Sequence, residues 1–222
     1  MKDSREVILQ RIRSGLTNAV AAGFGDIRQP PVHEVWPRTT PAPLSMVEQF
    51  SDELKSLHGE PIHCPTMADA RRTLAELMEA APWANMGALD SPLTRELTAE
   101  LPPERVAWVT ADWTALQIEK LPVGLIAADA LLADTGSCVV TCTSSQERLM
   151  CYLPPACIVV ARIEQMAEHL PAAWSPISKT CTSPDSRGEV VLITGPSRTA
   201  DIEKKLILGV HGPKRLVVIV VG

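Results

Sequence analysis

Hydrophobic and polar positions alternate with two different periods from about residue 46 to the end of the chain. Short runs rich in Val, Ile and Leu predict buried strands, and segments with apolar residues at every third or fourth position predict helices. The predicted strands cover residues 61–64, 84–87, 105–110, 126–133, 137–141, 157–161, 190–194 and 215–221. The predicted helices cover residues 46–57, 66–80, 163–170 and 199–209, with a polar loop at 175–188. This alternation predicts an α/β fold with a mostly parallel sheet flanked by helices.

The N-terminal part of the chain has a different pattern. Apolar residues recur every three or four positions between Val7 and Leu16, and they predict an amphipathic helix over residues 4–20. Five prolines follow between Pro30 and Pro43, which predicts an extended connector. We therefore expect an N-terminal helical arm with a Pro-rich connector at 1–43 and an α/β domain at 44–222.

Composition agrees with a buried sheet and argues against several classes of protein. Of the 222 residues, 45% are hydrophobic and 4% are aromatic, so aliphatic side chains dominate, as in a sheet covered on both faces. A net charge of −5 argues against nucleic acid as the main partner. No apolar run reaches the roughly 20 residues of a membrane span, and the charged start of the chain lacks the apolar core of a signal peptide. We expect a soluble, cytoplasmic protein.

Six cysteines raise the question of a metal site, but their spacing does not fit one. The gaps between Cys138, Cys142, Cys151 and Cys157 match neither the Cys-x2-Cys pairs of zinc sites nor the cysteine run of ferredoxins. Cys138, Cys142 and Cys157 lie in or beside Val-rich strands, where a thiol behaves as a small hydrophobic side chain. The sequence therefore predicts reduced thiols, and neither a metal ion nor another cofactor held by this chain.

A candidate ligand site follows the penultimate predicted strand. Ligands of parallel sheets bind beyond the carboxyl ends of the strands, and the start of a helix presents free backbone N–H groups. We therefore predict that Gly195, Ser197, Arg198 and Thr199 bind a ligand. Arg198 would supply a guanidinium fork for a carboxylate or phosphate, and the two hydroxyl groups would donate hydrogen bonds. Asp201 in the first helical turn is the candidate catalytic residue, as an orienting or proton-accepting group.

The same residues also fit a purely structural role. Thr199 is a suitable N-cap, and Asp201 can pair with Lys205 one helical turn later. Asp201 and Glu203 already interact favourably with the helix dipole, so both oppose a strongly anionic ligand. The sequence leaves both interpretations open.

A second candidate segment is the tight turn predicted at Asp134-Thr135-Gly136, with Gly136 at a position that needs a positive φ. Asp129 and Asp134 flank an apolar stretch, and a carboxylate beside a buried strand needs a partner. Asp134 and Thr135 are therefore added to the candidate ligand-binding residues. A plain turn is the structural alternative.

Ser197 and His211 suggest a nucleophile and its base. A helix of ten residues between them would separate their backbones by about 15 Å, so we expect no Ser–His dyad.

Residues 124–222 resemble the lactate-utilisation (LUD) domain family, and most of all its small C subunit. The resemblance rests on the segments 128–137, 153–154, 194–203 and 209–213. It implies a fold like that of the CoA-transferase and sugar-isomerase superfamily. It also implies a role in oxidising L-lactate to pyruvate beside iron–sulfur subunits, whose clusters would lie on those partner chains.

Several functions stay open. The first is an accessory subunit of an iron–sulfur lactate-oxidation system, with a small carboxylate bound at the loop from Gly195 to Asp201. The alternative is a stand-alone enzyme related to CoA transferases or folate ligases, acting on a CoA thioester, a folate or a sugar phosphate. A binding module that works through its surface is the third. No Gly-x-Gly-x-x-Gly run follows a strand, so a self-contained nicotinamide or flavin dehydrogenase is not supported.

Overall fold

The structure is a computed structural model that describes residues 4–21, 43–181, 189–199, 207–209 and 211–222. The chain divides into two compact units, Met1–Arg38 and Thr39–Gly222. In the first unit, helix α1 (Ser4–Ala21) forms where the apolar spacing predicts it, and Ile8 and Ile12 are more than half exposed. The division predicted near residue 43 stays a prediction.

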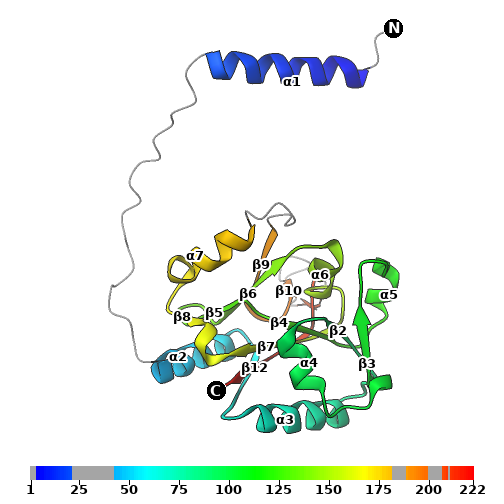
Figure 1. Ribbon diagram of the computed structural model, residues 1–222, viewed down its shortest axis with the longest axis vertical. Helices are drawn as coiled ribbons and strands as arrows, with labels where there is room; N and C mark the ends of the chain where they lie inside the picture. The colour runs from blue at the N-terminus through cyan, green and yellow to red at the C-terminus, as the bar shows by residue number, and fades with distance from the viewer. Residues whose placement is uncertain (1–3, 22–42, 182–188, 200–206, 210) are drawn as a thin grey trace. The chain divides into compact units, whose positions relative to one another are not determined.

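The second unit is built on a six-stranded sheet whose paired strands all run parallel (Figure 1). In spatial order the strands are β1 (Glu60–Cys64), β12 (Arg215–Val221), β7 (Ala156–Arg162), β4 (Gly124–Ala127), β2 (Met86–Leu89) and β3 (Val106–Val109). The central strands are runs of Val, Ile, Leu and Ala because both of their faces are buried. The predicted α/β class with a mostly parallel sheet is confirmed.

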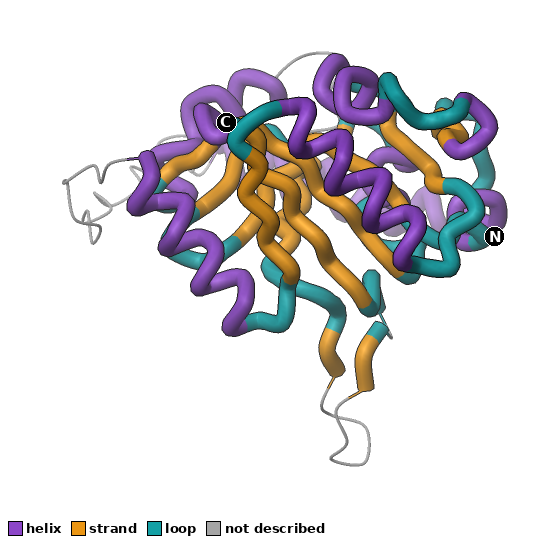
Figure 2. The backbone as a smooth tube through the Cα atoms, turned by 90° about the horizontal axis from the view of Figure 1, so that it is seen from below, coloured by secondary structure: helices purple, strands orange, loops and turns teal. Residues whose placement is uncertain are grey.

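Alternate residues of the central strands belong to two separate hydrophobic cores. In β12, Val218 and Val220 pack into one core, and Val217 and Ile219 pack into the other. Figure 2 shows the strands as a central layer with helices on both sides. One face is covered by α3 (Met67–Ala80) and α4 (Pro92–Thr98), and the other by α2 (Pro43–Ser56), α5 (Ala115–Glu119) and α6 (Ser145–Met150).

A second, mixed sheet shares the core that α2 covers. Its order is β8 (Met166–Ala167), β5 (Ala130–Leu132), β6 (Ser137–Cys142) and β9 (Glu189–Ile193). Strand β6 is antiparallel to both of its neighbours, whereas β5 and β8 are parallel. Helix α7 (Leu170–Cys181) packs against this sheet through Ala173 and Ile177. Strand β9 therefore does not belong to the parallel sheet.

The prediction of one continuous strand over 126–133 is wrong. Strand β4 ends at Ala127 in the parallel sheet, and β5 begins at Ala130 in the mixed sheet. The backbone N–H of Ala128 still bonds to a strand of the first sheet, and that of Asp129 already bonds to a strand of the second. The apolar run is continuous because both sheets are buried, but the chain changes sheets within it.

The predicted helix at 163–170 and the predicted loop from residue 175 are also wrong. A short 3-10 turn (Ile163–Gln165) leads into β8, which pairs with β5, and the helix begins only at Leu170. Helix α7 then continues through Pro176 to Cys181. Proline inside a helix removes a hydrogen bond, but the burial of Ala173 and Ile177 on either side of it favours the helix.

The predicted helix at 199–209 is wrong at both of its ends. Strands β10 (Arg198–Thr199) and β11 (Ile207–Leu208) form an antiparallel hairpin. The N–H of Gly209 donates to the C=O of Ser197 at 2.9 Å, which ties the two ends of the segment together. A ten-residue helix would hold these ends about 15 Å apart. The candidate catalytic Asp201 lies outside the described residues.

No helix in the described ranges is long and apolar enough to cross a membrane.

Candidate functional site

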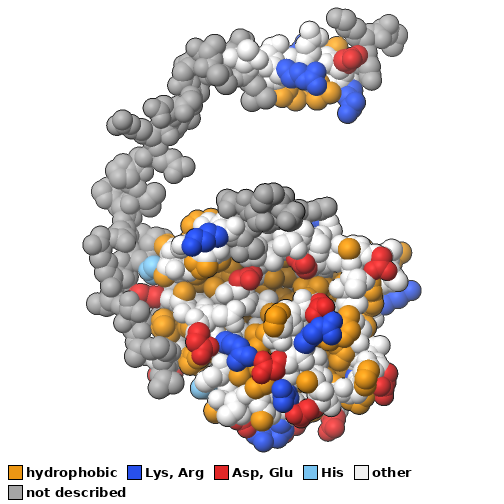
Figure 3. Space-filling model, viewed as in Figure 1, with side chains coloured by type: hydrophobic (Ala, Val, Ile, Leu, Met, Phe, Trp, Pro, Cys, Tyr) orange, Lys and Arg blue, Asp and Glu red, His pale blue; other side chains and the backbone are white. Residues whose placement is uncertain are grey.

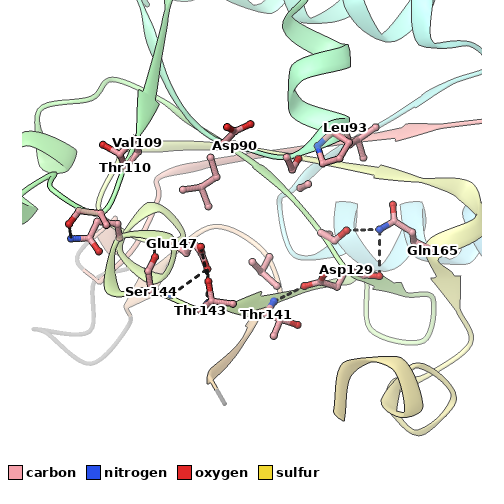
Figure 4. Close-up of a pocket in the computed structure, with 18 of the residues that line it drawn as sticks. Asp90, Leu93, Val109, Thr110, Asp129, Thr141, Thr143, Ser144, Glu147 and Gln165 are labelled. Atoms are coloured by element: carbon pink, nitrogen blue, oxygen red, sulfur yellow. Dashed lines mark hydrogen bonds between the residues drawn. The ribbon is translucent and has the colours of Figure 1, made fainter. Parts of the chain in front are cut away.

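A cavity of about 800 Å³ opens at the carboxyl edge of the parallel sheet (Figure 4). The ends of β2, β3, β4 and β7 line it, and the mixed sheet contributes β6 together with the start of α6. Ligands of open α/β sheets bind in this position, beyond the carboxyl ends of the strands. The cavity is therefore a candidate ligand site that lies away from the predicted loop.

Two side chains at the junction of the two sheets shape the floor of this cavity. The carboxylate of Asp129 accepts a hydrogen bond from the backbone N–H of Thr141 through Oδ2 at 2.6 Å. Gln165 fixes the junction by donating from Nε2 to the C=O of Ala128 at 2.6 Å. The hydroxyl oxygen of Thr141 is buried and has no hydrogen-bond partner among the residues that the structure describes. A buried hydroxyl without a partner costs free energy, and this oxygen has almost no surface that a molecule in the cavity could reach.

Glu147 combines a structural role with a charge at the cavity. It is the third residue of α6, and its carboxylate accepts from the backbone N–H of Thr143 at 2.5 Å and from the Thr143 hydroxyl at 2.9 Å. Ser144 caps the same helix by accepting from the N–H of Glu147 at 3.2 Å. Figure 4 shows the Glu147 and Asp129 side chains beside the same cavity, on α6 and on the β4–β5 junction.

Carboxylates outnumber cations in the lining of this cavity. Asp90, Asp129 and Glu147 line it together with one arginine, Arg162. Arg162 already pairs with Glu96, with Nη2 and Oε2 2.6 Å apart. The two carboxylate oxygens of Asp90 accept hydrogen bonds from Arg95 at 2.5 and 2.7 Å. Arg95 does not itself line the cavity. These hydrogen bonds lower the pKa of Asp90 below its usual value. The carboxyl edge therefore has an acidic character that opposes anionic ligands.

The predicted loop from Gly195 to Thr199 lies at the opposite edge of the sheet. The N–H of Ser197 donates to the C=O of Pro213 at 2.8 Å, just before the start of β12. The N–H of Lys214 donates in the same way to Pro155, just before the start of β7, also at 2.8 Å. Placing this loop at the carboxyl edge is therefore wrong, because β9 belongs to the mixed sheet. The ligand-binding roles of its residues stay a prediction.

The structure brings the loop together with the second candidate turn. The hydroxyl of Ser137 lies 2.9 Å from that of Thr135 and 2.8 Å from that of Thr194, the residue before Gly195. Thr135 in turn donates to Asp134 at 3.2 Å. The prediction that Gly136 adopts a positive φ is confirmed, with a value of 61°.

Basic side chains lie along the loop at this amino edge. Nη1 of Arg198 lies 3.1 Å from Nδ1 of His58, and both side chains are exposed. A smaller cavity of about 380 Å³ lies nearby, lined by His211 and Lys214 among others. The backbone N–H of His211 donates to the hydroxyl of Ser197 at 3.3 Å, so the expected wide separation of these two residues is wrong. The hairpin, rather than a helix, brings their backbones together.

Five cysteines lie in the core rather than around an open site. Cys64, Cys138, Cys142, Cys151 and Cys157 are buried, and their thiols are free. Burial raises the pKa of Cys157 to about 12 and that of Cys138 further. Within the described part of the chain, no group of three or more His, Cys, Asp or Glu side chains is arranged to hold a metal ion.

We expect Cys181 to react with iodoacetamide at about pH 8 well before Cys138 and Cys157, because alkylation needs an exposed thiolate. Cys181 is partly exposed, whereas the two core thiols are fully buried. Mass spectrometry of tryptic peptides after timed labelling measures the three rates, and in urea they should become similar. Equally fast labelling of Cys157 in the folded protein would contradict the core that we describe.

Sequence reasoning missed the importance of Asp129, Thr141 and Glu147. The carboxylate of Asp129 beside an apolar run does indicate a position that needs a partner. Its pairing with Thr141 depends on the change of sheet at the β4–β5 junction, which the continuous apolar run hides. The Ser-x-x-Glu spacing from Ser144 to Glu147 predicts a capping box, which could have placed the start of α6.

The fold and the cavity define an α/β protein with a ligand-sized hollow at the carboxyl edge of a parallel sheet. The profile of the LUD domain family matches residues 47–221, so this chain belongs to the LUD domain family.

Known relatives agree with this assignment. "Lactate utilization protein C" of Macrococcus caseolyticus is 35% identical over 112 residues, which are 46% of this chain and 45% of that protein. This match spans less than half of the relative's length. The protein of the same name from Geobacillus sp. strain WCH70 is 28% identical over 194 residues, 79% of this chain and 78% of that protein. A DUF162 family protein from Deinococcus radiodurans, solved by crystallography, shares the fold with a TM-score of 0.62 at 17% identity, over 82% of this chain and 100% of that chain.

Proposed function

We propose that this chain is an accessory subunit of a system that oxidises L-lactate to pyruvate, and that iron–sulfur subunits of the same system carry the electrons. The observation that supports this most is the 28% identity over 194 residues with a protein named "Lactate utilization protein C". Oxidation of lactate releases two electrons, so an acceptor is required. In this proposal the clusters that accept them lie on partner chains. Five of the six cysteines of this chain are dispersed through the core, which agrees with that division of roles.

The ligand in this proposal is a small carboxylate at the amino edge of the sheet. Arg198 would bind it through its guanidinium fork, with Ser197 and Thr199 as hydroxyl donors, and Gly195 would allow a close approach of the backbone. Asp134 and Thr135 would contribute from the neighbouring turn, and Asp201 would orient the ligand or accept a proton.

Charge supports this choice of edge. Arg198 and Lys214 are cations at this edge, where one carboxylate, that of Glu119, lines the smaller cavity, whereas three carboxylates line the cavity at the carboxyl edge. A carboxylate ligand is stabilised by the two cations and repelled by the three carboxylates.

Deleting the gene is expected to abolish growth on L-lactate, and the wild-type gene should restore it. The Arg198→Ala variant should restore growth poorly, because the carboxylate would lose its cation. Arg72→Ala is the matched control, since Arg72 is an exposed arginine of α3 that pairs with Asp69. Growth rates on lactate and on glucose measure the effect.

Normal growth of the deletion strain on lactate, with no paralogue to substitute, would overturn the proposal. Full rescue of growth by Arg198→Ala would contradict the proposed carboxylate site but would agree with the proposed role in lactate oxidation. Purification of the tagged protein from lactate-grown cells should also recover iron–sulfur proteins, visible by their absorption and iron content.

One observation favours the alternative of a stand-alone enzyme. The cavity of about 800 Å³ at the carboxyl edge is in the size range of sites for drug-sized ligands, and it is much larger than a three-carbon acid needs. Its acidic lining opposes the phosphates of CoA or of a sugar phosphate. Thermal-shift measurements with acetyl-CoA, folates and lactate separate this enzyme from the accessory subunit.

A further inference from the structure

We propose that His58 is a positioning residue for Arg198, and that its imidazole orients the guanidinium so that the free edge of the fork meets a small carboxylate. This inference rests on the proposed function, because it takes Arg198 as the cation of the carboxylate site. Three observations carry it: the backbone conformation of His58, its contact with Arg198, and the packing of both candidate segments against the end of α2.

His58 occupies a backbone position at which glycine is usual. The N–H of His58 donates to the C=O of Lys55 at 2.9 Å, and the N–H of Gly59 donates to the C=O of Leu54 at the same distance. These two bonds form a Schellman motif at the end of α2, in which the residue at the position of His58 is most often glycine. With a φ of 70°, His58 is the one residue other than glycine with a positive φ in the described part of the chain. A side chain with a Cβ atom costs free energy in this conformation, so a histidine here indicates a role for its side chain.

The imidazole of His58 holds one side of the Arg198 guanidinium. Nη1 of Arg198 lies 3.1 Å from Nδ1 of His58. An arginine side chain only donates hydrogen bonds, so Nδ1 is the acceptor and the imidazole is neutral, with its proton on Nε2. The C-terminal end of a helix also carries a partial negative charge that favours a cation beside it. The exposed guanidinium is therefore tethered to the end of α2.

The remaining edge of the guanidinium is the edge that binds a carboxylate elsewhere in this protein. No described residue forms a hydrogen bond with Nε or Nη2 of Arg198. In Arg215 the same two atoms donate to the two carboxylate oxygens of Glu60, at 2.8 and 2.7 Å. Such a pair of parallel bonds needs a guanidinium in a fixed orientation. Because His58 holds Nη1, the other edge is both oriented and free for a carboxylate ligand.

The last turn of α2 also supports both candidate segments. A Cβ atom added to Gly136 would lie 2.5 Å from the backbone nitrogen of Leu54, and one added to Gly195 would lie 3.1 Å from the Cβ of Leu57. The two segments therefore meet at the end of α2, and His58 is the next residue along the chain. Its side chain sets the position of the arginine relative to the rest of the candidate site.

The variants His58→Gly and His58→Asn separate a positioning role from a role in ending the helix. Glycine relieves the positive φ but removes the acceptor, whereas asparagine tolerates this conformation and carries Oδ1 in the place of Nδ1. The purified full-length chain is titrated with L-lactate by calorimetry, and its melting temperature is recorded. We expect His58→Gly to keep or raise the melting temperature and to weaken lactate binding about fivefold, and His58→Asn to bind within about twofold of the wild type.

A histidine that only ended the helix would be replaced by glycine without any loss of affinity. Lactate binding by His58→Gly as tight as that of the wild type would therefore overturn the inference. So would equal losses of affinity in the glycine and asparagine variants, because asparagine retains the acceptor.

The double variant Arg198→Ala/His58→Gly tests whether His58 acts through Arg198. Arg198→Ala alone should weaken lactate binding, and the added His58→Gly should weaken it no further. An additional loss in the double variant would mean that His58 acts on the ligand independently of Arg198, which contradicts a positioning role.

The same titrations distinguish a failure of this inference from a failure of the proposed function. If Arg198→Ala weakens lactate binding and His58→Gly does not, the carboxylate site is supported and the role of His58 is rejected. If Arg198→Ala binds lactate as the wild type does, or if the wild type does not bind it, the proposed carboxylate site is wrong and the inference is rejected with it.

Discussion

Replacing Gly136 with alanine is expected to lower the free energy of unfolding of the α/β domain by about 2–5 kcal/mol. Gly136 has a φ of +61°, which disfavours any residue with a Cβ atom. An added Cβ would also lie 2.5 Å from the backbone nitrogen of Leu54 and 2.9 Å from its Cα, and a helix backbone has little freedom to move away. Urea unfolding followed by circular dichroism measures the loss.

The matched control is Gly15→Ala in the N-terminal helix. A Cβ there meets nothing within 4 Å, and the residue lies in the other compact unit. The unfolding midpoint of the α/β domain should stay unchanged. If both alanine variants shift that midpoint equally, the close contact between the β5–β6 turn and α2 does not exist in solution.

Truncating Phe50 to alanine is expected to cost about 3–5 kcal/mol of unfolding free energy. Phe50 lies on α2, is fully buried and packs in the core between the two sheets, as Leu54 does one turn later. Removing the ring leaves a cavity that the surrounding strands cannot fill. Denaturant titration measures the change, and Phe50→Leu should lose much less because most of the volume remains.

Leu116→Ala is the control for Phe50→Ala, because Leu116 is 68% exposed on α5. Its effect should stay within about 0.5 kcal/mol. A loss below about 1 kcal/mol for Phe50→Ala would mean that α2 is not part of the folded core, and that the domain begins after it.

Elements with local signals could be predicted from the sequence, and helix α3 is the best example. The predicted range begins at Thr66, which caps the helix by accepting from the backbone N–H of Asp69 at 3.1 Å, and the helix ends at Ala80 as predicted. The long apolar strands β7 and β12 were also predicted, because burial on both faces leaves a continuous hydrophobic run.

On the face shown in Figure 3, acidic and basic side chains lie among each other and form no continuous basic area, in keeping with the small net charge.

Elements whose form depends on distant pairing could not be predicted. Strand β8 has two residues and exists because β5 lies beside it. The hairpin at Arg198 and Leu208 has apolar spacing that also fits a helix, and contacts of Ser197 with Gly209 and Pro213 decide between them. Periodicity reports on one chain segment at a time, so it does not contain this information.

The position of the candidate loop in the fold could not be predicted, and the ligand-binding roles of its residues stay a prediction. The rule that ligands bind at the carboxyl edge was applied to the loop after residue 194, which follows a strand of the mixed sheet. The same rule applied to β2, β3, β4 and β7 leads to the cavity around Asp129 and Thr141. The missing information was strand order.

Strand β7 links the two cavities, since Pro155 beside its start lines the smaller one and Arg162 at its end lines the larger. Seven extended residues span about 23 Å. Molecules held at these two places are too distant for a group to pass directly from one to the other. If both places are filled in one polypeptide, each occupant can alter the affinity of the other only through thermodynamic linkage, and that influence must be equal in both directions.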